Sequence, residues 1–371
     1  MKQGWEYKKF ETCINKTPKP KQVKTEDYNS GTKYPIVSQE DKLISGYYDD
    51  ESYVFHIDSP VVIFGDHTRV LKYVDFDFVV GADGVKIISP KQDLNAKFLL
   101  YYLQWYKIPN LGYSRHYKLL KELNIPLPPK STQLAIVSEL DKINELIRLK
   151  KEQLKDFDNL AQSIFYEMFG DPVENEMGWE VKKLGEVCNI TSSKRIFADE
   201  YTDKGIPFYR SKEVIERSKG LPISVELFIS PERYSEIKEK FGIPNVGDIL
   251  VTAVGTIGKI WSIDTDEKFY FKDGNLVWLK DIDSSLANTI FFRRLLEYLI
   301  DEYKKINANG AAYSALTIAK LKLMQCPLPP LPLQHLFSQR IDQIEHQKAE
   351  VQKAITDLET LLASRMQYWF E

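Results

Sequence analysis

The sequence predicts an α/β (α+β) protein in which two pseudo-repeated domains of mixed strands and helices are separated by two long helices forming an antiparallel coiled coil. Three observations support this prediction. A proline-rich step occurs twice, as IPLPPKSTQ at 125–133 and as CPLPPLPLQ at 326–334. Each step is preceded by short β-branched and aromatic runs, and each is followed by a long run of apolar residues at spacings of three and four. An internal repeat of this kind defines the architecture of a chain.

The two halves carry the same markers in the same order. GWEYKKF at 4–10 returns as GWEVKKL at 178–184, and the Asp-Gly pair at 83–84 returns at 273–274. Runs such as PVVIF and DILVTAV predict strands, and the Asp-Gly pairs predict hairpin turns. Each half then shows a helical pattern, at 95–106 and at 287–305. Each half is therefore expected to fold as one mixed domain.

The proline step ends the globular part of each half and begins a long helix. Proline has no backbone N–H and disfavours the helical conformation in the residue before it. The residues that follow have the a/d spacing of a coiled coil over about 38 residues, or roughly 57 Å of helix. The apolar positions are Ile136, Leu140, Ile143, Ile147, Leu154, Phe157, Ala161, Ile164 and Met168 in the first run, and Phe337, Ile341, Ile344, Val351, Ile355, Leu358, Leu362 and Trp369 in the second.

An apolar stripe of this length must be buried, and the economical partner for each helix is the other one. Lys150 and Lys348 occupy stripe positions near the middle of their helices, which is compatible with an antiparallel pair. The alternative is that each helix docks separately on its own globular half. If the helices pair, the globular halves lie at opposite ends and the monomer imitates a twofold dimer.

These patterns predict four segments. A first globular domain is expected at 1–128, a central helix at 129–170, a second globular domain at 171–328 and a C-terminal helix at 329–371.

Composition excludes several classes of protein. The chain has 371 residues, of which 43% are hydrophobic and 28% are charged, so a disordered chain is excluded. No apolar run reaches about 18 residues, and the first ten residues lack the apolar segment of a signal peptide. Cys13, Cys188 and Cys326 are widely separated and show no ligand spacing. A cytoplasmic protein with reduced thiols and no membrane association is expected.

The charge of the chain is small but unevenly distributed. The net charge of −3 argues mildly against a long polyanion as partner. However, the segment from Lys2 to Lys24 has seven lysines and two acidic residues, which gives a local charge of +5. This segment is either a basic binding face or a solvated terminus.

No strong catalytic motif is present, so we expect no enzyme activity from this chain alone. GTIGK at 255–259 is too short for a phosphate loop, and there is no HExxH pair. Asp171, Glu180 and Lys182 could suggest a nuclease, but the WExKK segment recurs in the first half without the preceding acid. An amino-methyltransferase would need Asn or Asp before Pro-Pro, and both copies have Leu there. A binding protein with two different heads on a common frame is favoured.

The repeated unit resembles a known family. The segments GWEVKKLGEVC, GTIGK, GYSRHYKLLKELNIPLPPKSTQLAIVSELD and PLPPLPLQHLFSQRIDQIE look like those of the specificity subunit of type I restriction-modification systems. The resemblance covers essentially the whole chain. The first half departs from it at 65–69, where GDHTR replaces the family-like GTIGK. The resemblance therefore does not predict the backbone conformation of this loop.

The resemblance implies both a function and partners. In that family each globular half is a target recognition domain, and the protein reads a bipartite, gapped sequence in double-stranded DNA without catalysing a reaction. It assembles with two methylase subunits, which bind S-adenosylmethionine, and with restriction subunits, which hydrolyse ATP with Mg²⁺. No cofactor or metal is expected on the present chain. Half-sites read from one face would lie about one helical turn apart, roughly 34 Å.

Loop residues that carry hydrogen-bond donors are the candidates for DNA contact. Lys and Arg attract phosphates, whereas contacts to base edges supply sequence information. Arg115 and Arg210 lead the set because Arg can make two hydrogen bonds to guanine. The full set is Lys16, Lys19, Lys21, Ser38, Arg69, Arg115 and His116 in the first half, and Ser193, Lys194, Arg195, Arg210, Lys212, Thr256, Lys259, Asn275 and Tyr313 in the second.

The helices are the expected docking site for the methylase subunits. Helix packing would place these subunits on the outer faces, near Gln133, Phe169, Gln334 and Trp369. An alternative class is a structural scaffold, in which the coiled coil is the function and the heads bind protein or sugar. DNA affinity that falls steeply with salt would separate the two classes.

Overall fold

The chain divides into two units, each of which holds one globular domain and one part of each long helix. The computed structural model describes residues 2, 4–112, 114–307 and 315–371. The first unit is Met1–Leu154 with Glu350–Glu371, and the second is Lys155–Ala349. Among the described residues, no helix is both long and apolar enough to cross a lipid bilayer.

The globular domain of the first unit is built from two sheets and a two-stranded ribbon. Its strands are β1 (Glu6–Lys9), β2 (Ile14–Asn15), β3 (Tyr34–Val37), β4 (Gly46–Tyr48), β5 (Val54–Phe55), β6 (Val61–Gly65), β7 (Leu71–Val74), β8 (Phe78–Val80), β9 (Val85–Pro90) and β10 (Asn124–Leu127). Its helices are α1 (Phe10–Cys13), α2 (Ala96–Tyr106) and α3 (Tyr117–Lys121). The sheet orders are β2-β9-β6-β7 and β4-β3-β8-β5, and β1 pairs antiparallel with β10.

The second unit repeats this arrangement. Its strands are β11 (Glu180–Lys183), β12 (Asn189–Thr191), β13 (Tyr201–Thr202), β14 (Ile206–Tyr209), β15 (Phe228–Ile229), β16 (Ile249–Thr252), β17 (Ile260–Ser262), β18 (Tyr270–Phe271), β19 (Leu276–Lys280) and β20 (Gln325–Leu328). Its helices are α5 (Leu184–Val187), α6 (Ser211–Ser218), α7 (Pro231–Phe241), α8 (Thr289–Ile306) and α9 (Ile318–Leu323). The order β12-β19-β16-β17, the ribbon β11-β20 and the parallel pair β14-β18 match β2-β9-β6-β7, β1-β10 and β3-β8. The other sheet differs, with the order β13-β15-β14-β18 in place of β4-β3-β8-β5. The predicted repeat is confirmed, with this difference at the edges of one sheet.

Both faces of the central strand are buried in each unit. Val62 and Phe64 of β6 pack with α2, whereas Val61 and Ile63 pack with the strands of the other sheet. Successive side chains of a strand point to opposite faces, so a strand covered on both sides reads as one continuous apolar run. Strand β16 shows the same alternation between two clusters.

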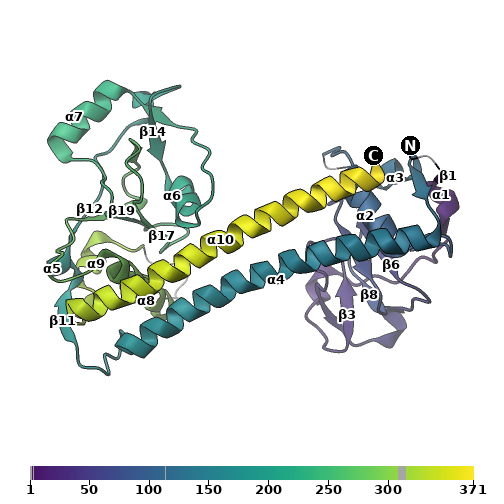
Figure 1. Ribbon diagram of the computed structural model, residues 1–371, viewed down its shortest axis with the longest axis horizontal. Coiled ribbons are helices and arrows are strands. Elements are labelled where there is room, and N and C mark those ends of the chain that lie inside the picture. The colour runs from purple at the N-terminus through teal and green to yellow at the C-terminus, as the bar shows by residue number, and fades with distance from the viewer. Residues whose placement is uncertain (1, 3, 113, 308–314) are drawn as a thin grey trace. The chain divides into compact units, whose positions relative to one another are not determined.

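The two long helices, α4 (Lys130–Phe169) and α10 (Leu331–Phe370), lie side by side (Figure 1). In the first unit, Lys151 of α4 forms an ion pair with Glu359 of α10 at 2.7 Å, and Glu139 contacts Arg365. Residue numbers therefore rise along one helix and fall along its neighbour. The predicted antiparallel pairing is confirmed in this unit.

The same pairing holds in the second unit. Asp158 of α4 lies 2.8 Å from the ammonium of Lys348, and the rings of Phe165 and Phe337 have centroids 5.6 Å apart. The ammonium of Lys348 also lies 3.3 Å from the carboxylate of Glu345 on its own helix. Lys348 can therefore occupy a position in the apolar stripe while its charged end is paired with carboxylates. A polar residue in an apolar seam is tolerated when its charged end is paired.

Burial along α10 follows the predicted stripe up to Ile355. Phe337, Ile341, Ile344, Val351 and Ile355 are all 7% exposed or less. The spacing of three and four residues keeps these side chains on one face of the helix. Beyond Ile355, Leu358, Leu362 and Trp369 are only half-buried, and Phe370 is the buried residue at the C-terminal end.

Burial along α4 departs from the predicted stripe near its C-terminal end. Phe165 and Phe169 are buried there, whereas Ile164 and Met168 are only partly buried. A straight helix drifts by about 20° per heptad from an ideal seam. Phe291 of α8 packs on the drifted face, with its ring centroid 4.8 Å from that of Phe169.

The two Asp-Gly turns do not close hairpins, so that prediction is wrong. Gly84 (φ 95°) and Gly274 (φ 75°) adopt left-handed conformations, as such turns require. However, β8 and β9 belong to different sheets, and so do β18 and β19. Each turn carries the chain from one sheet to the other, because a turn sequence sets local direction but not the strand partner.

Candidate nucleic-acid interface

Several loops of the first unit meet around Gln39. Its side-chain amide donates to the carbonyl of Asp83 (3.0 Å) and accepts from the backbone N–H of His67 (3.3 Å). Its own carbonyl accepts from the hydroxyl of Thr68 at 2.7 Å. Arg115 reaches the same place, with its guanidinium 3.5 Å from the carboxylate of Asp83. We call the loops at 38–45, 65–70 and 81–84, together with residues 110–112 and 114–116, the first loop cluster.

Ser38 and His116 lie inside the first loop cluster rather than on its surface. Ser38 is 2% exposed, and its hydroxyl lies 2.6 Å from that of Ser45. His116 is completely buried; its Nδ1 is 2.9 Å from the Asp66 carbonyl, and its Nε2 accepts from the Leu111 N–H at 3.0 Å. The prediction that Ser38 and His116 contact DNA is therefore wrong, because neither side chain can be reached from outside.

His116 instead positions the loop that carries Arg115. Because Nε2 accepts a hydrogen bond, Nδ1 carries the proton and donates to the Asp66 carbonyl. We expect His116→Ala to lower the free energy of unfolding by about 1–3 kcal/mol, since buried backbone groups lose their partners. Denaturant unfolding measures this, and Arg115→Ala is the matched control, which should leave stability unchanged. Wild-type stability in the His116→Ala variant would contradict this role.

The other predicted contacts of the first unit carry accessible cations. Lys16, Lys19 and Lys21 are exposed on the segment between β2 and β3, and the Lys21 ammonium donates to the Ser52 hydroxyl at 3.0 Å. Arg69 is half-buried in the turn between β6 and β7. These four residues and Arg115 stay predictions, and their accessibility is compatible with phosphate or base contact.

In the second unit, Arg210 and Lys212 belong to an ion-pair network. Arg210 lies 2.9 Å from the buried Glu213 and 2.8 Å from Glu226, and Lys212 lies 2.9 Å from Glu226. Hydrogen bonds from Lys212 and Arg210 lower the pKa of Glu226 to about 2. The buried Glu213 holds the Arg210 guanidinium in place. A base edge that binds this guanidinium would therefore have to displace only the exposed partner, Glu226.

Ser193 is buried, with 9% of its surface exposed, and its hydroxyl has no hydrogen-bond partner in the described part of the chain. Its prediction as a DNA contact is wrong for the same reason as that of Ser38. Its neighbours Lys194 and Arg195 are exposed. Arg195 pairs with Asp273 at 2.7 Å, and the Lys194 ammonium lies 5.3 Å from the centroid of the Phe241 ring.

The turn between β16 and β17 exposes Thr256 and Lys259, while Asn275 is half-buried beside it. The carbonyl of Asn275 accepts from the N–H of Ala253 at 2.8 Å, which joins this turn to the start of β19. Tyr313, the last predicted contact, lies outside the described residues.

The glutamines at the two helix entries are internal, so their prediction as methylase contacts is wrong. Gln334 is completely buried; its side-chain oxygen accepts from the Asn288 N–H at 2.8 Å, and its amide donates to the carbonyls of Leu286 (3.0 Å) and Pro329 (2.7 Å). Gln133, equally buried, makes the matching three bonds in the first unit. Each glutamine ties the start of a long helix to the N-terminal cap of α8 or α2.

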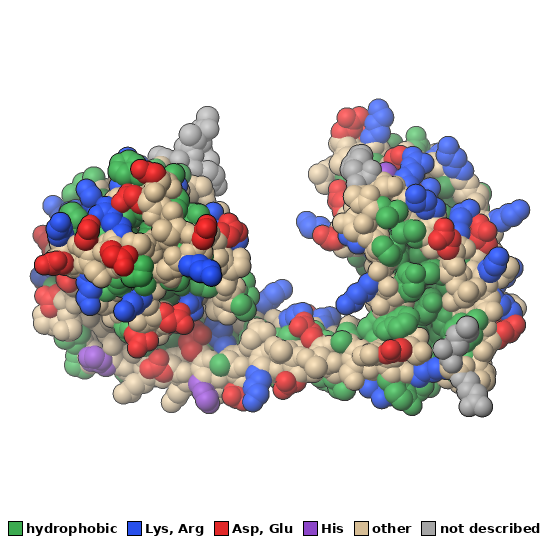
Figure 2. Space-filling model, turned by 90° about the horizontal axis from the view of Figure 1, so that it is seen from above, with side chains coloured by type: hydrophobic (Ala, Val, Ile, Leu, Met, Phe, Trp, Pro, Cys, Tyr) green, Lys and Arg blue, Asp and Glu red, His purple; other side chains and the backbone are tan. Residues whose placement is uncertain are grey.

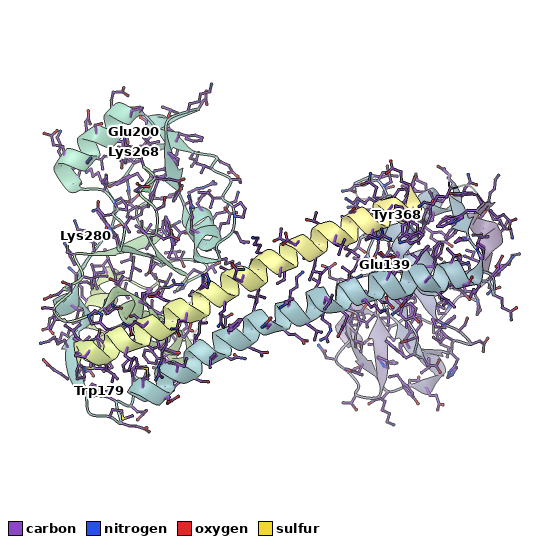
Figure 3. The ribbon with its side chains drawn as sticks, viewed as in Figure 1. Glu139, Trp179, Glu200, Lys268, Lys280 and Tyr368 are labelled. Carbon is purple, nitrogen blue, oxygen red and sulfur yellow. The ribbon has the colours of Figure 1, made fainter. Side chains whose placement is uncertain are left out.

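The two aromatic residues predicted as methylase contacts differ in exposure. Phe169 is 3% exposed inside an aromatic cluster, so its prediction is wrong. Trp369 is half-buried, and its indole N–H donates to Glu139 at 3.0 Å. The Arg365 guanidinium, and then Trp369, hold the pKa of Glu139 below its ordinary value. Figure 3 labels Glu139 on α4 and Tyr368, the neighbour of Trp369, on α10.

On the face seen in Figure 2, positive charge is mixed with negative charge. Figure 2 shows Lys and Arg side chains interspersed with Asp and Glu on the visible face of each globular part. Several exposed cations are paired, including Arg115 with Asp83 and Arg195 with Asp273. Solvent-exposed pairs contribute little to stability, so a phosphate can replace the carboxylate at small cost.

Sequence reasoning missed two residues that hold the first loop cluster together. One is Gln39, whose role depends on contacts with two other loops, at 65–70 and 81–84. The other is Lys72, which is 5% exposed and donates to the Ser38 carbonyl at 2.9 Å. Burial lowers the pKa of Lys72. A lysine within the apolar run VLKYV at 70–74 was the available signal, because such a charge must find partners when it is buried.

Comparison with known proteins shows the family. A family model described as the type I restriction modification DNA specificity domain matches residues 2–156 and 176–360. The chain belongs to this family. The two matched regions each contain one of the repeated globular domains, so the specificity domain occurs twice.

Individual relatives of this specificity protein agree with that result. A putative type I restriction enzyme specificity subunit of Haemophilus influenzae is 30% identical over 303 residues, which cover 77% of this chain and 74% of the relative. The MjaIX specificity subunit of Methanocaldococcus jannaschii is 27% identical over 261 residues, which cover 65% of this chain and 58% of the relative.

Solved structures show the same fold. The S subunit of a type I restriction-modification system from M. genitalium matches with a TM-score of 0.56 at 17% identity. The match covers 99% of this chain and 96% of the M. genitalium chain. A chain solved in work on complex assembly and conformational transition of the type I R-M system has a TM-score of 0.59 at 20% identity, with coverages of 99% and 98%.

Proposed function

We propose that this specificity protein reads a bipartite, gapped DNA site, with one half-site for each globular domain. The observation that carries the proposal is that one sheet and one ribbon are repeated with the same strand order in two domains whose loops differ. A common frame with different loops is expected when each copy reads a different sequence. Joining two readers in one chain makes the second contact intramolecular, so two weak contacts produce one tight complex.

The loop chemistry supports two different half-sites. The turn between β6 and β7 carries GDHTR, whereas the turn between β16 and β17 carries GTIGK. Arg115 and Arg210 are the best-placed readers of base edges, since each guanidinium is accessible and is held by a carboxylate that DNA can replace. A bidentate contact from Arg selects guanine in the major groove.

Methylase subunits would dock on the outer faces of α4 and α10. The support is a set of leucines that these helices leave 43–51% exposed: Leu134, Leu146, Leu149, Leu160, Leu336 and Leu361. Packing against a partner helix would bury such side chains. The methylases would bind S-adenosylmethionine, and restriction subunits joining the complex would bind ATP and Mg²⁺.

Methylome sequencing of the host with and without the gene tests the proposal. We expect a two-part methylated motif to disappear when the gene is deleted. The purified complex should bind a duplex of that motif with an affinity that falls about 10³–10⁵-fold between about 50 and about 200 mM salt if six to ten phosphates are contacted. An unchanged methylome, or DNA affinity that does not respond to salt, would exclude this function and favour a protein scaffold.

A further inference from the structure

Arg69, in the first loop cluster, occupies a position where the second unit has a glycine, Gly258. Arg69 and Gly258 are equivalent, because the N–H of each donates back into its own turn, to Gly65 at 2.7 Å and to Thr252 at 2.8 Å. Both residues are left-handed, with φ of 63° for Arg69 and 78° for Gly258. Glycine adopts this conformation without strain, whereas an arginine with a Cβ does not.

The space beside these two equivalent residues also differs. In the second unit α8 continues past the turn, and a Cβ on Gly258 would lie 2.5 Å from Ile300. In the first unit the shorter α2 ends at Tyr106. Counted from the N-terminal cap of each helix, Lys107 corresponds to Ile300, because each is twelve residues after its cap. The early end of α2 therefore leaves room for a side chain at position 69.

A groove of about 610 Å³ occupies that room. It is lined by Thr68, Arg69, Val70, Leu71, Leu103, Gln104, Lys107, Ile108, Pro109 and Asn110. Lys107 is exposed and, like Arg69, is a left-handed non-glycine residue, with φ of 49°. Glycine is usual at such a position after a helix. Two strained cations therefore line one groove.

The chemistry of the groove favours an anion. The described residues that line it include two cations and no Asp or Glu. The Arg69 guanidinium donates to the Ile108 carbonyl at 3.2 Å, which orients it and leaves its other N–H groups for a ligand. Strained residues persist where the surrounding structure and a function retain them.

We propose that Arg69 and Lys107 form a phosphate clamp that holds one backbone phosphate of the DNA at the first half-site. This inference rests on the proposed DNA-reading function and adds to it a contact that positions the duplex without reading sequence. The groove adjoins the first loop cluster, because Thr68 and Arg69 belong to both. Among the described residues of the second unit, α8 fills the space that corresponds to the groove, so a clamp of this kind is not formed there.

The test uses substitutions that remove charge and relieve strain together. Arg69→Gly and Lys107→Gly replace each cation with the residue that its backbone conformation favours, so both variants should fold with a Tm equal to or above that of the wild type. Lys33→Ala is the matched control, because Lys33 is an exposed cation of the same unit that does not line the groove. Binding of a mixed-sequence DNA duplex by the full chain is measured across a salt series.

We expect each glycine variant to weaken DNA binding about tenfold at low salt, as the loss of one charged hydrogen bond would. The slope of log affinity against log salt should fall by about one for each substitution. Lys33→Ala should retain the wild-type slope. A wild-type slope in both Arg69→Gly and Lys107→Gly would overturn the clamp while leaving the DNA-reading function intact. Failure of the wild-type protein to bind DNA both alone and in the purified complex would overturn that function itself.

A thermal-shift series with inorganic phosphate distinguishes a DNA phosphate from a free one. If the clamp serves DNA, the glycine variants should lose DNA affinity whether or not millimolar phosphate stabilises the wild type. Stabilisation of the wild type alone, together with unchanged DNA binding by the variants, would assign the groove to a free phosphate and reject the clamp.

Discussion

Replacing Phe165 with alanine should lower the stability of the second unit by about 4 kcal/mol. Phe165 is 1% exposed, and its ring centroid lies 4.5 Å from that of Tyr298 and 5.6 Å from that of Phe337. Truncating a buried phenylalanine typically costs about 3–5 kcal/mol, because apolar burial is lost and a cavity remains. Since a domain is stable by only about 5–15 kcal/mol, this is a large fraction of the total.

Peptide-resolved hydrogen exchange is the suitable measurement, because a chain of two units need not unfold in one step. Peptides from α8 and from the parts of α4 and α10 that belong to the second unit should lose protection together. Leu160→Ala is the control on the same helix, since Leu160 is 46% exposed and its loss should change stability by no more than about 0.5 kcal/mol. Equal protection in the Phe165 and Leu160 variants would show that the aromatic cluster does not hold α4 to the domain.

Replacing Gln334 with alanine should cost about 3 kcal/mol, and Gln133→Ala should cost a similar amount in the first unit. Each change removes three hydrogen bonds from a completely buried amide and leaves backbone groups around a helix cap unpaired. An unsatisfied buried polar group costs about 1–3 kcal/mol. Urea unfolding of the purified chain measures the effect, and Gln343→Ala, an exposed change on the same helix, is the control.

The glutamine variants also decide between two roles for these residues. If the glutamines were methylase contacts, their substitution would reduce co-purification of the methylase and leave the stability of the chain unchanged. Because both glutamines are buried, we expect their substitution to lower the stability of the purified chain itself, in the absence of methylase. A stable Gln334→Ala chain that fails to recruit methylase would contradict the internal role.

The repeated architecture could be predicted from the sequence because its signals are local. The proline step before each long helix and the spacing of Phe337, Ile341 and Ile344 depend on neighbouring residues only. The alternating burial in β6 and β16 likewise produces continuous apolar runs that identify strands without knowledge of their partners. The pairing of the helices followed because each stripe needed a partner of similar length.

The candidate interface could be predicted only in part. The exposed cations Arg115, Lys212 and Lys259 were found because charged side chains in loops usually reach the surface. His116, Ser38 and Gln334 were assigned to the surface and are buried. Their polar groups are satisfied by residues distant in sequence, and no local pattern reports such partners.

The sequence by itself determined that this protein has two copies of one domain, each followed by a long amphipathic helix, since propensity, periodicity and turn chemistry act over a few residues. Only the tertiary structure decided which loop residues face outward, and it alone revealed the groove that Arg69 and Lys107 share. The groove depends on where α2 ends beside a turn that is distant in sequence. The exposure of the loop side chains likewise depends on packing between distant segments and not on the residue types alone.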